Sequence, residues 1–104
     1  MKNLLLLLFL TVIGHLTFGQ SFQNELATRA KNLVNSSIVY DPAYHQIPYP
    51  MGDVDAKTGV CTDVIIRAYR LMGIDLQKEV HEDMTKNFAQ YPKKWGMKST
   101  DRNI

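Results

Sequence analysis

Apolar residues recur at steps of three and four in three stretches of the chain, and this spacing predicts three helices. We expect these helices over 21–37, 61–72 and 75–88, each with polar residues on its opposite face. The apolar stripes consist of Phe22, Leu26, Ala30, Leu33 and Val34 in the first helix, Val64, Ile65, Ala68, Leu71 and Met72 in the second, and Leu76, Val80, Met84 and Phe88 in the third. Each stripe needs another element to cover it, so the helices are expected to pack on one another.

Residues typical of helix ends mark the limits of the second and third helices. Gly73 fits the position that follows a helix C-terminus, and Asp75 fits the N-cap of the third helix. The third helix is expected to end at Tyr91-Pro92, because proline restricts the residue before it. Beyond this point, Trp95 is expected to be a packing anchor.

The segment 41–60 predicts a long loop. It holds three Xaa-Pro pairs and turn-forming residues such as Gly52 and Gly59, which favour extended and turn conformations. A loop of this length is usually functional or disordered, and its tyrosines argue against disorder. Only the short piece 38–40 is expected to be extended, so the chain predicts three helices and almost no strand.

The N-terminus has the pattern of a secretory signal peptide. Lys2 precedes an apolar run that starts at Leu4, and small residues follow up to Gly19. The alternative is a membrane anchor, but the uninterrupted apolar run is well short of the ~20 residues that span a bilayer. We therefore expect residues 1–19 to be a leader. Residues 20–104 are then expected to be secreted or periplasmic, with no stable membrane span after cleavage.

Charge and residue spacing favour neither a nucleic-acid partner nor a metal. The chain has 12 Lys and Arg against 10 Asp and Glu, and Lys2 leaves with the leader, so the basic excess of a nucleic-acid-binding domain is missing. His81, Glu82 and Asp83 are adjacent on a predicted helix, so their side chains point in different directions and are not expected to share a metal.

Cys61 is the single cysteine of the chain, so it forms no internal disulfide. It opens the second predicted helix, where free N–H groups and the helix dipole favour thiolate over thiol. The thiolate is the attacking species of cysteine hydrolases. The alternative is a small buried hydrophobe, since Cys61 lies three and four residues before Val64 and Ile65 on the apolar stripe. These residues alone leave both interpretations open.

A cysteine nucleophile needs a histidine base from another element, and no histidine of the chain is an obvious one. His15 leaves with the leader, and His45 is expected on the surface of the loop. His81 is expected to flank the apolar face of the third helix rather than to act as a base.

Five blocks of residues occur in an order that is typical of a known family. The blocks are Tyr49-Pro50-Met51-Gly52-Asp53-Val54, Gly59-Val60-Cys61-Thr62-Asp63-Val64-Ile65, Gly73-Ile74-Asp75-Leu76-Gln77-Lys78, Val80-His81-Glu82-Asp83-Met84, and Tyr91-Pro92 to Trp95-Gly96. Together they resemble the start of the domain-of-unknown-function family 1287 (DUF1287). Its members are secreted bacterial proteins grouped with the papain-like, NlpC-type cell-wall peptidases and amidases.

The resemblance implies an α+β papain-like (NlpC-type) fold, in which the helix that starts at Cys61 packs on an antiparallel sheet. It also implies that the sheet, the histidine base and the residue that orients this base come after Ile104. Residues 20–104 would then be the mainly helical N-terminal part of a truncated domain that lacks the sheet. We expect such a part to be marginally stable and inactive.

The resemblance further implies that Cys61 is the nucleophile of a hydrolase that cleaves an amide bond in cell-wall peptides. Tyr49, Asp53 and Asp63 are expected to shape the substrate pocket, because of their positions in the matching blocks. No cofactor is implied. The alternative is a small secreted binding module without enzyme activity, in which the loop rich in tyrosine and proline recognises the partner and Cys61 is a core residue.

Overall fold

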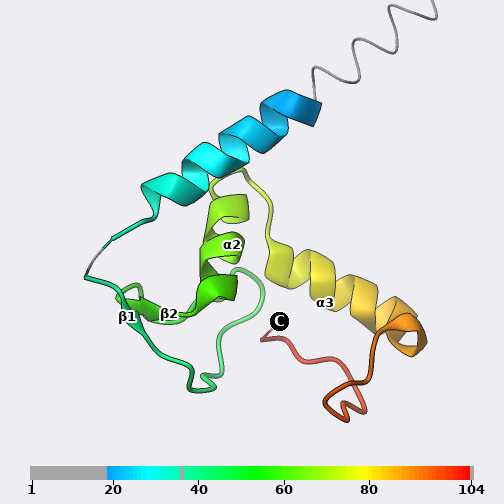
Figure 1. Cartoon of the computed structure of the whole chain (residues 1–104). Coiled ribbons are helices and arrows are strands. Elements are labelled where there is room, and N and C mark those ends of the chain that lie inside the picture. Colours follow the sequence, from blue (N-terminus) through cyan, green and yellow to red (C-terminus); the bar gives the residue numbers. More distant parts are fainter. Residues whose placement is uncertain (1–18, 36, 104) are drawn as a thin grey trace, which may run out of the picture.

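The computed structural model describes residues 19–35 and 37–103. Helices cover 19–32, α2 (Cys61–Arg70) and α3 (Leu76–Asn87), and a short 3-10 helix, η1 (Phe88–Gln90), continues α3 (Figure 1). The three predicted helices are therefore confirmed. The predicted leader falls outside the described residues except for Gly19, and none of the described helices is long and apolar enough to cross a bilayer.

The first helix ends five residues before the predicted end, and Asn35 gives a physical reason. Its side-chain oxygen accepts hydrogen bonds from the Ser37 N–H at 3.0 Å and from the Ser37 hydroxyl at 2.9 Å. Local hydrogen bonds of this kind compete with the helical ladder and favour a turn. The helix therefore gives way to a bend that leads into β1 (Val39–Tyr40).

β1 and β2 (Thr58–Gly59) form a two-stranded parallel sheet, with Val39 opposite Thr58 and Tyr40 opposite Gly59. This confirms the prediction that the described part of the chain has almost no strand. β2 leads through Val60 directly into α2, so the small sheet lies at the N-terminal end of that helix (Figure 1).

Both ends of α2 follow from local sequence. At its start, the Asp63 carboxylate accepts a hydrogen bond from the Val60 N–H at 2.7 Å, which satisfies a donor that precedes the first turn. At its end, Gly73 adopts φ +80°, a left-handed conformation that glycine takes most easily. Ile74 then donates its N–H to the Tyr69 carbonyl at 3.0 Å, so the predicted stop at Gly73 is confirmed.

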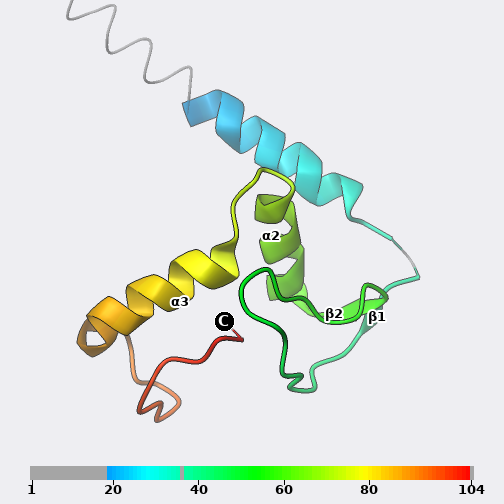
Figure 2. The ribbon, with the colours of Figure 1, turned by 180° about the vertical axis from the view of Figure 1, so that it is seen from behind.

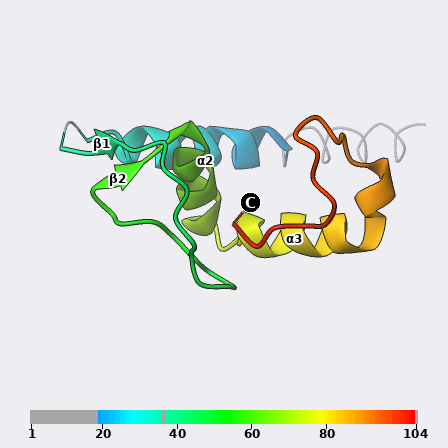
Figure 3. The same ribbon diagram turned by 90° about the horizontal axis from the view of Figure 1, so that it is seen from below.

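The helix 19–32 crosses α2 near the C-terminal end of α2. After a short connecting loop, α3 runs away from α2 (Figures 1 and 2). The last described residues turn back beside α3, toward the middle of the molecule (Figure 3). Hydrogen bonds fix this return, because Gln77 donates to the Arg102 carbonyl and the His81 ring contacts the Asp101 carbonyl.

The packed core of the described residues is small. Its buried hydrophobic side chains are Ala68, 1% exposed, and Met84, 8% exposed. By contrast, Ile65 on the predicted stripe of α2 is 53% exposed, and Val64 and Leu71 are exposed as well. The expectation that the helices cover each other's stripes is therefore wrong for much of α2. Trp95 is 82% exposed, so its predicted role as a packing anchor is also wrong.

Candidate functional site

Cys61 is the first residue of α2, and its thiol is free and exposed. The prediction that it opens the helix is confirmed. Its exposure contradicts the alternative in which Cys61 is a core residue, at least within the part of the chain that the structure describes. An accessible sulfur at a helix N-terminus is the arrangement that cysteine nucleophiles use.

Asp63 and Asp53 both line one cavity beside the start of α2. This cavity has a volume of about 230 Å³, and Val60, which precedes Cys61, also lines it. His45 is a further lining residue. The structure therefore brings together two of the three predicted pocket residues close to the candidate nucleophile.

The carboxylate of Asp63 is committed to the Val60 N–H, so its main contact stabilises the first turn of α2. The carboxylate of Asp53 is committed to Arg67 in a two-pronged ion pair. Its Oδ2 accepts from Arg67 Nε at 2.9 Å and its Oδ1 accepts from Arg67 Nη2 at 3.0 Å. Both carboxylates thus shape the backbone next to Cys61.

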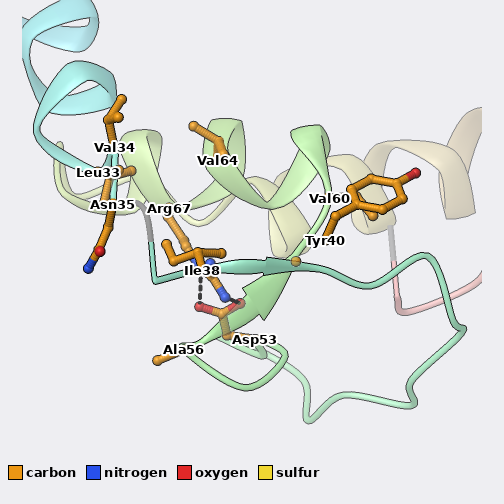
Figure 4. Close-up of a pocket in the computed structure, with 11 residues that line it drawn as sticks. Leu33, Val34, Asn35, Ile38, Tyr40, Asp53, Ala56, Val60, Val64 and Arg67 are labelled. Carbon is orange, nitrogen blue, oxygen red and sulfur yellow. Dashed lines mark hydrogen bonds and ion pairs between the residues drawn. The ribbon is translucent and has the colours of Figure 1, made fainter.

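Arg67 also fixes the chain that enters α2. Its Nη2 donates to the carbonyl oxygens of Asp55 at 3.3 Å and Thr58 at 3.2 Å. The hydrogen bonds to Asp53 raise the pKa of the Arg67 guanidinium above its usual range, against the opposing effect of burial, so Arg67 stays charged. Figure 4 shows the Asp53–Arg67 pair in the wall of a second, larger cavity of about 550 Å³, which otherwise has mostly apolar neighbours such as Ile38 and Val64.

Tyr49, the third predicted pocket residue, does not line either of these two cavities. Its ring instead meets the His81 ring edge-on, with 5.1 Å between the ring centroids. Nδ1 of His81 lies 3.2 Å from the Asp101 carbonyl oxygen. Tyr49 therefore contacts α3 through His81, which in turn contacts the C-terminal segment, and Tyr49 does not share the cavity that Asp53 and Asp63 line.

His45 and His81 both make local contacts in the described structure. Nε2 of His45 lies 2.7 Å from Oδ2 of Asp41 on the loop. The Ala43 N–H and then His45 hold the pKa of the Asp41 carboxyl below its usual range. Among the described residues, no hydrogen bond joins Cys61 to His45 or His81, and no three His, Cys, Asp or Glu side chains are grouped to hold a metal ion.

Four side chains that hold the loop before α2 were not predicted from the sequence to be functional. They are Arg67, Arg70, Asp75 and Gln77. Each is also compatible with an ordinary exposed helix surface or cap, so a single sequence carries no pattern that marks it. The block 73–78 of the family resemblance includes Asp75 and Gln77, and this block is the sequence feature that points to these two residues.

Comparison with known proteins decides the family. Residues 27–104 match the family described as "Domain of unknown function (DUF1287)". The chain belongs to the DUF1287 family. The match begins well before Tyr49, where the resemblance was expected to start, and it includes α2, α3 and all four predicted site residues.

The DUF1287 chain is similar to a protein named "Uncharacterized protein YijF" from Escherichia coli (strain K12). The two are 56% identical over 79 residues, which cover 76% of this chain and 38% of YijF. The chain therefore spans less than two fifths of the length of that relative. No solved structure matches the chain.

Proposed function

We propose that the DUF1287 domain is a cysteine hydrolase that cleaves an amide bond in peptides of the bacterial cell envelope, with Cys61 as its nucleophile. The observation that carries this proposal is the exposed Cys61 thiol at the first residue of α2. The family resemblance supports it, because it groups DUF1287 with papain-like, NlpC-type peptidases and amidases. In that fold, an antiparallel sheet would cover the helix that starts at Cys61.

The chemistry follows from the thiol. The Cys61 sulfur loses its proton to a base and attacks the amide carbonyl carbon, which forms a tetrahedral intermediate. The C–N bond then breaks, the amine leaves with the proton, and the acyl group remains on sulfur as a thioester. Water hydrolyses the thioester, releases the acid and restores the thiol. No step needs a metal or another cofactor, and the resemblance assigns the base to a histidine after Ile104.

The other predicted site residues have supporting roles in this proposal. Asp63 holds the first turn of α2, and Asp53 with Arg67 holds the chain that enters it. Both line the cavity beside the helix start, so they shape the approach of the substrate. Tyr49 does not line this cavity, and its ring packs against His81 on α3 instead. The leader-like N-terminus supports a secreted or periplasmic location, where cell-wall peptides are the natural partners.

Replacement of Cys61 tests the hydrolase. In the full-length protein, Cys61→Ala is expected to reduce the cleavage of peptidoglycan-derived peptides, followed by mass spectrometry, to the uncatalysed rate. Thr62→Ala is the matched control, because Thr62 is an exposed neighbour on the same helical turn, and it is expected to keep the activity. Unchanged cleavage by the Cys61→Ala protein would exclude the proposed mechanism.

One observation favours a second candidate, a non-enzymatic binding module. Tyr40, which precedes the loop, is 71% exposed, and Tyr44, which lies in it, is 69% exposed. Exposed tyrosines are common in recognition surfaces. A module of this kind binds peptidoglycan peptides without cleaving them and loses affinity when Tyr44 is changed to Ala. Binding that survives in Cys61→Ala, with no product from the unchanged protein, would favour this candidate over the hydrolase.

A further inference from the structure

Gln77 is the most buried polar residue of the described chain, with 0% of its surface exposed. Gln77 lies in the first turn of α3, and its side-chain amide makes three hydrogen bonds to other segments. Oε1 accepts from the Gly52 N–H at 2.8 Å, while Nε2 donates to the Pro48 carbonyl at 2.8 Å and to the Arg102 carbonyl at 2.7 Å. The amide therefore joins the loop, α3 and the C-terminal segment at one buried point.

Two further side chains hold the same part of the loop. Asp75 accepts the Met51 N–H at 2.8 Å, and Arg70 donates to the Gly52 carbonyl at 2.9 Å. Met51 has φ +61°, a left-handed conformation that costs a residue with a side chain about 1–2 kcal/mol. These hydrogen bonds hold the loop in a conformation that it would not adopt alone.

The held loop continues directly to the entrance of α2. Asp53 follows Gly52 and forms the ion pair with Arg67, and Arg67 binds the carbonyl oxygens of Asp55 and Thr58. Thr58 lies three residues before Cys61. Hydrogen bonds and the short backbone segments between them thus link Gln77 to Thr58, just before the helix that carries the candidate nucleophile.

We propose that Gln77 is a positioning residue, which sets the loop 48–53 and, through Asp53 and Arg67, the N-terminal turn of α2 that carries Cys61. As a role in catalysis this inference rests on the proposed function, while its effect on the loop and on the thiol can be measured without any activity. Glutamine suits the role because one amide supplies both the acceptor for Gly52 and the donors for Pro48 and Arg102.

Gln77→Met tests the proposal, because methionine has a similar length but offers no N–H donor and only a weak sulfur acceptor. The variant is made in the full chain, and amide hydrogen exchange is followed by NMR. We expect the Gly52 and Met51 amides to lose at least tenfold protection, while the Ala68 amide in the middle of α2 keeps its own. Gln90→Met is the matched control, since Gln90 is an exposed glutamine in η1, and it is expected to change neither value.

The second measurement is the rate at which iodoacetamide alkylates Cys61 in the folded protein. When the loop is released, the first turn of α2 frays, and the N–H groups that stabilise a thiolate at a helix start are lost. We expect alkylation to slow at least threefold in Gln77→Met and to stay the same in Gln90→Met. A loosened loop with an unchanged alkylation rate would overturn the positioning role, as would unchanged protection of Gly52.

If Gln77→Met does not fold, exchange of the unchanged protein in low concentrations of urea decides the question. Opening of the Gly52, Met51 and Thr58 amides in one step, below the free energy of global unfolding, would support the proposal. Independent opening of these amides would overturn it. None of these results depends on peptide cleavage, so failure of the hydrolase in the Cys61→Ala test is distinguishable from failure of the Gln77 role.

Discussion

The α-carbon of Gly52 faces the Pro48 carbonyl oxygen so closely that there is no room for a side chain. A Cβ placed on Gly52 would lie 1.9 Å from that oxygen and 3.0 Å from Nε2 of Gln77. A backbone oxygen cannot swing aside as the end of a flexible side chain can. The loop must therefore open at Gly52 to accept any other residue, and the buried Gln77 amide would lose its partners.

Gly52→Ala is accordingly expected to lower the free energy of unfolding by about 1–3 kcal/mol or more, as overpacking of a tight site does. Gly73→Ala is the control, because Gly73 has φ +80° but open space around it. That change should lower the free energy of unfolding only by the strain of a left-handed alanine, about 1 kcal/mol. Urea unfolding of both variants gives the two values, and an equal loss would show that the Gly52 contact is not the cause.

A pH dependence is expected at Asp75, which holds the Met51 N–H and lies 3.4 Å from Arg70. Burial raises the pKa of the Asp75 carboxyl, but the hydrogen bond from Met51, with others from the backbone and Arg70, outweighs burial and places the pKa below 3.8. The charged form is thus favoured in the folded state. Its contribution to stability is complete above pH 3.8 and is lost as pH falls through the lower folded value.

The comparison of Asp75→Asn with the unchanged protein isolates this contribution. We expect the unchanged protein to be more stable at pH 6 and the difference to shrink toward zero as the solution is acidified to about pH 2. Glu79→Gln, an exposed change on the same helix, should leave the pH dependence as it is. A difference that stays constant down to the lowest pH would contradict the assignment.

At this scale, the sequence singled out Cys61 but left its role open, and it did not identify the residues that hold the loop before α2. Cys61 is recognisable as a candidate because it is the single cysteine of the chain and opens a predicted helix. Gln77 and Gly52 have roles that exist only after two segments 25 residues apart meet, and the hydrogen bond between them is a property of the folded chain. Asp53 could be named from its position, but its ion pair with Arg67 could not.

Among the helices, α2 is the one attached most firmly to the loop before it, through Arg67 and Arg70. Arg67→Lys is expected to cost about 1–2 kcal/mol, because lysine cannot reproduce the two-pronged contact with Asp53 or reach both carbonyl oxygens. The Arg67 side chain is 13% exposed, so water screens this pair only partly.

Arg29→Lys is the matched control for that prediction. Arg29 pairs with Glu25 one helical turn away, and both side chains are largely exposed. Such a pair contributes less than about 0.5 kcal/mol, so the change should have little effect on urea unfolding. Equal losses in the two variants would show that the Arg67 contacts do not hold the loop.

Periodicity predicted the helices well and their ends unevenly. Gly73 and Asp75 delimit α2 and α3 because their backbone preferences act locally. The first helix ends near residue 32 because the Asn35 side chain binds Ser37, a competition that counting apolar residues does not detect. The parallel pairing of β1 with β2 could not be predicted either, since two residues in each strand are too few to carry an alternating pattern.

For the molecule as a whole, periodicity identifies which face of a helix is apolar but not whether another element covers it. Met84 and Ala68 are covered within the described chain, while Val64 and Ile65 are not. The pattern of residues is the same in both cases. An apolar stripe on α2 with no cover is consistent with the papain-like arrangement in the proposed function, where a sheet packs on this helix.

The exposed stripe gives the last prediction, which separates covered from uncovered apolar residues. Met84→Ala should lower the free energy of unfolding by about 2–3 kcal/mol, because it empties space in a packed site. Ile65→Ala should cost less than about 1 kcal/mol, because the side chain is 53% exposed and its removal leaves no cavity. Urea unfolding of the 104-residue chain measures both. A loss at Ile65 as large as that at Met84 would mean that α2 is covered in solution, and the exposed face would then have to be assigned to an interface.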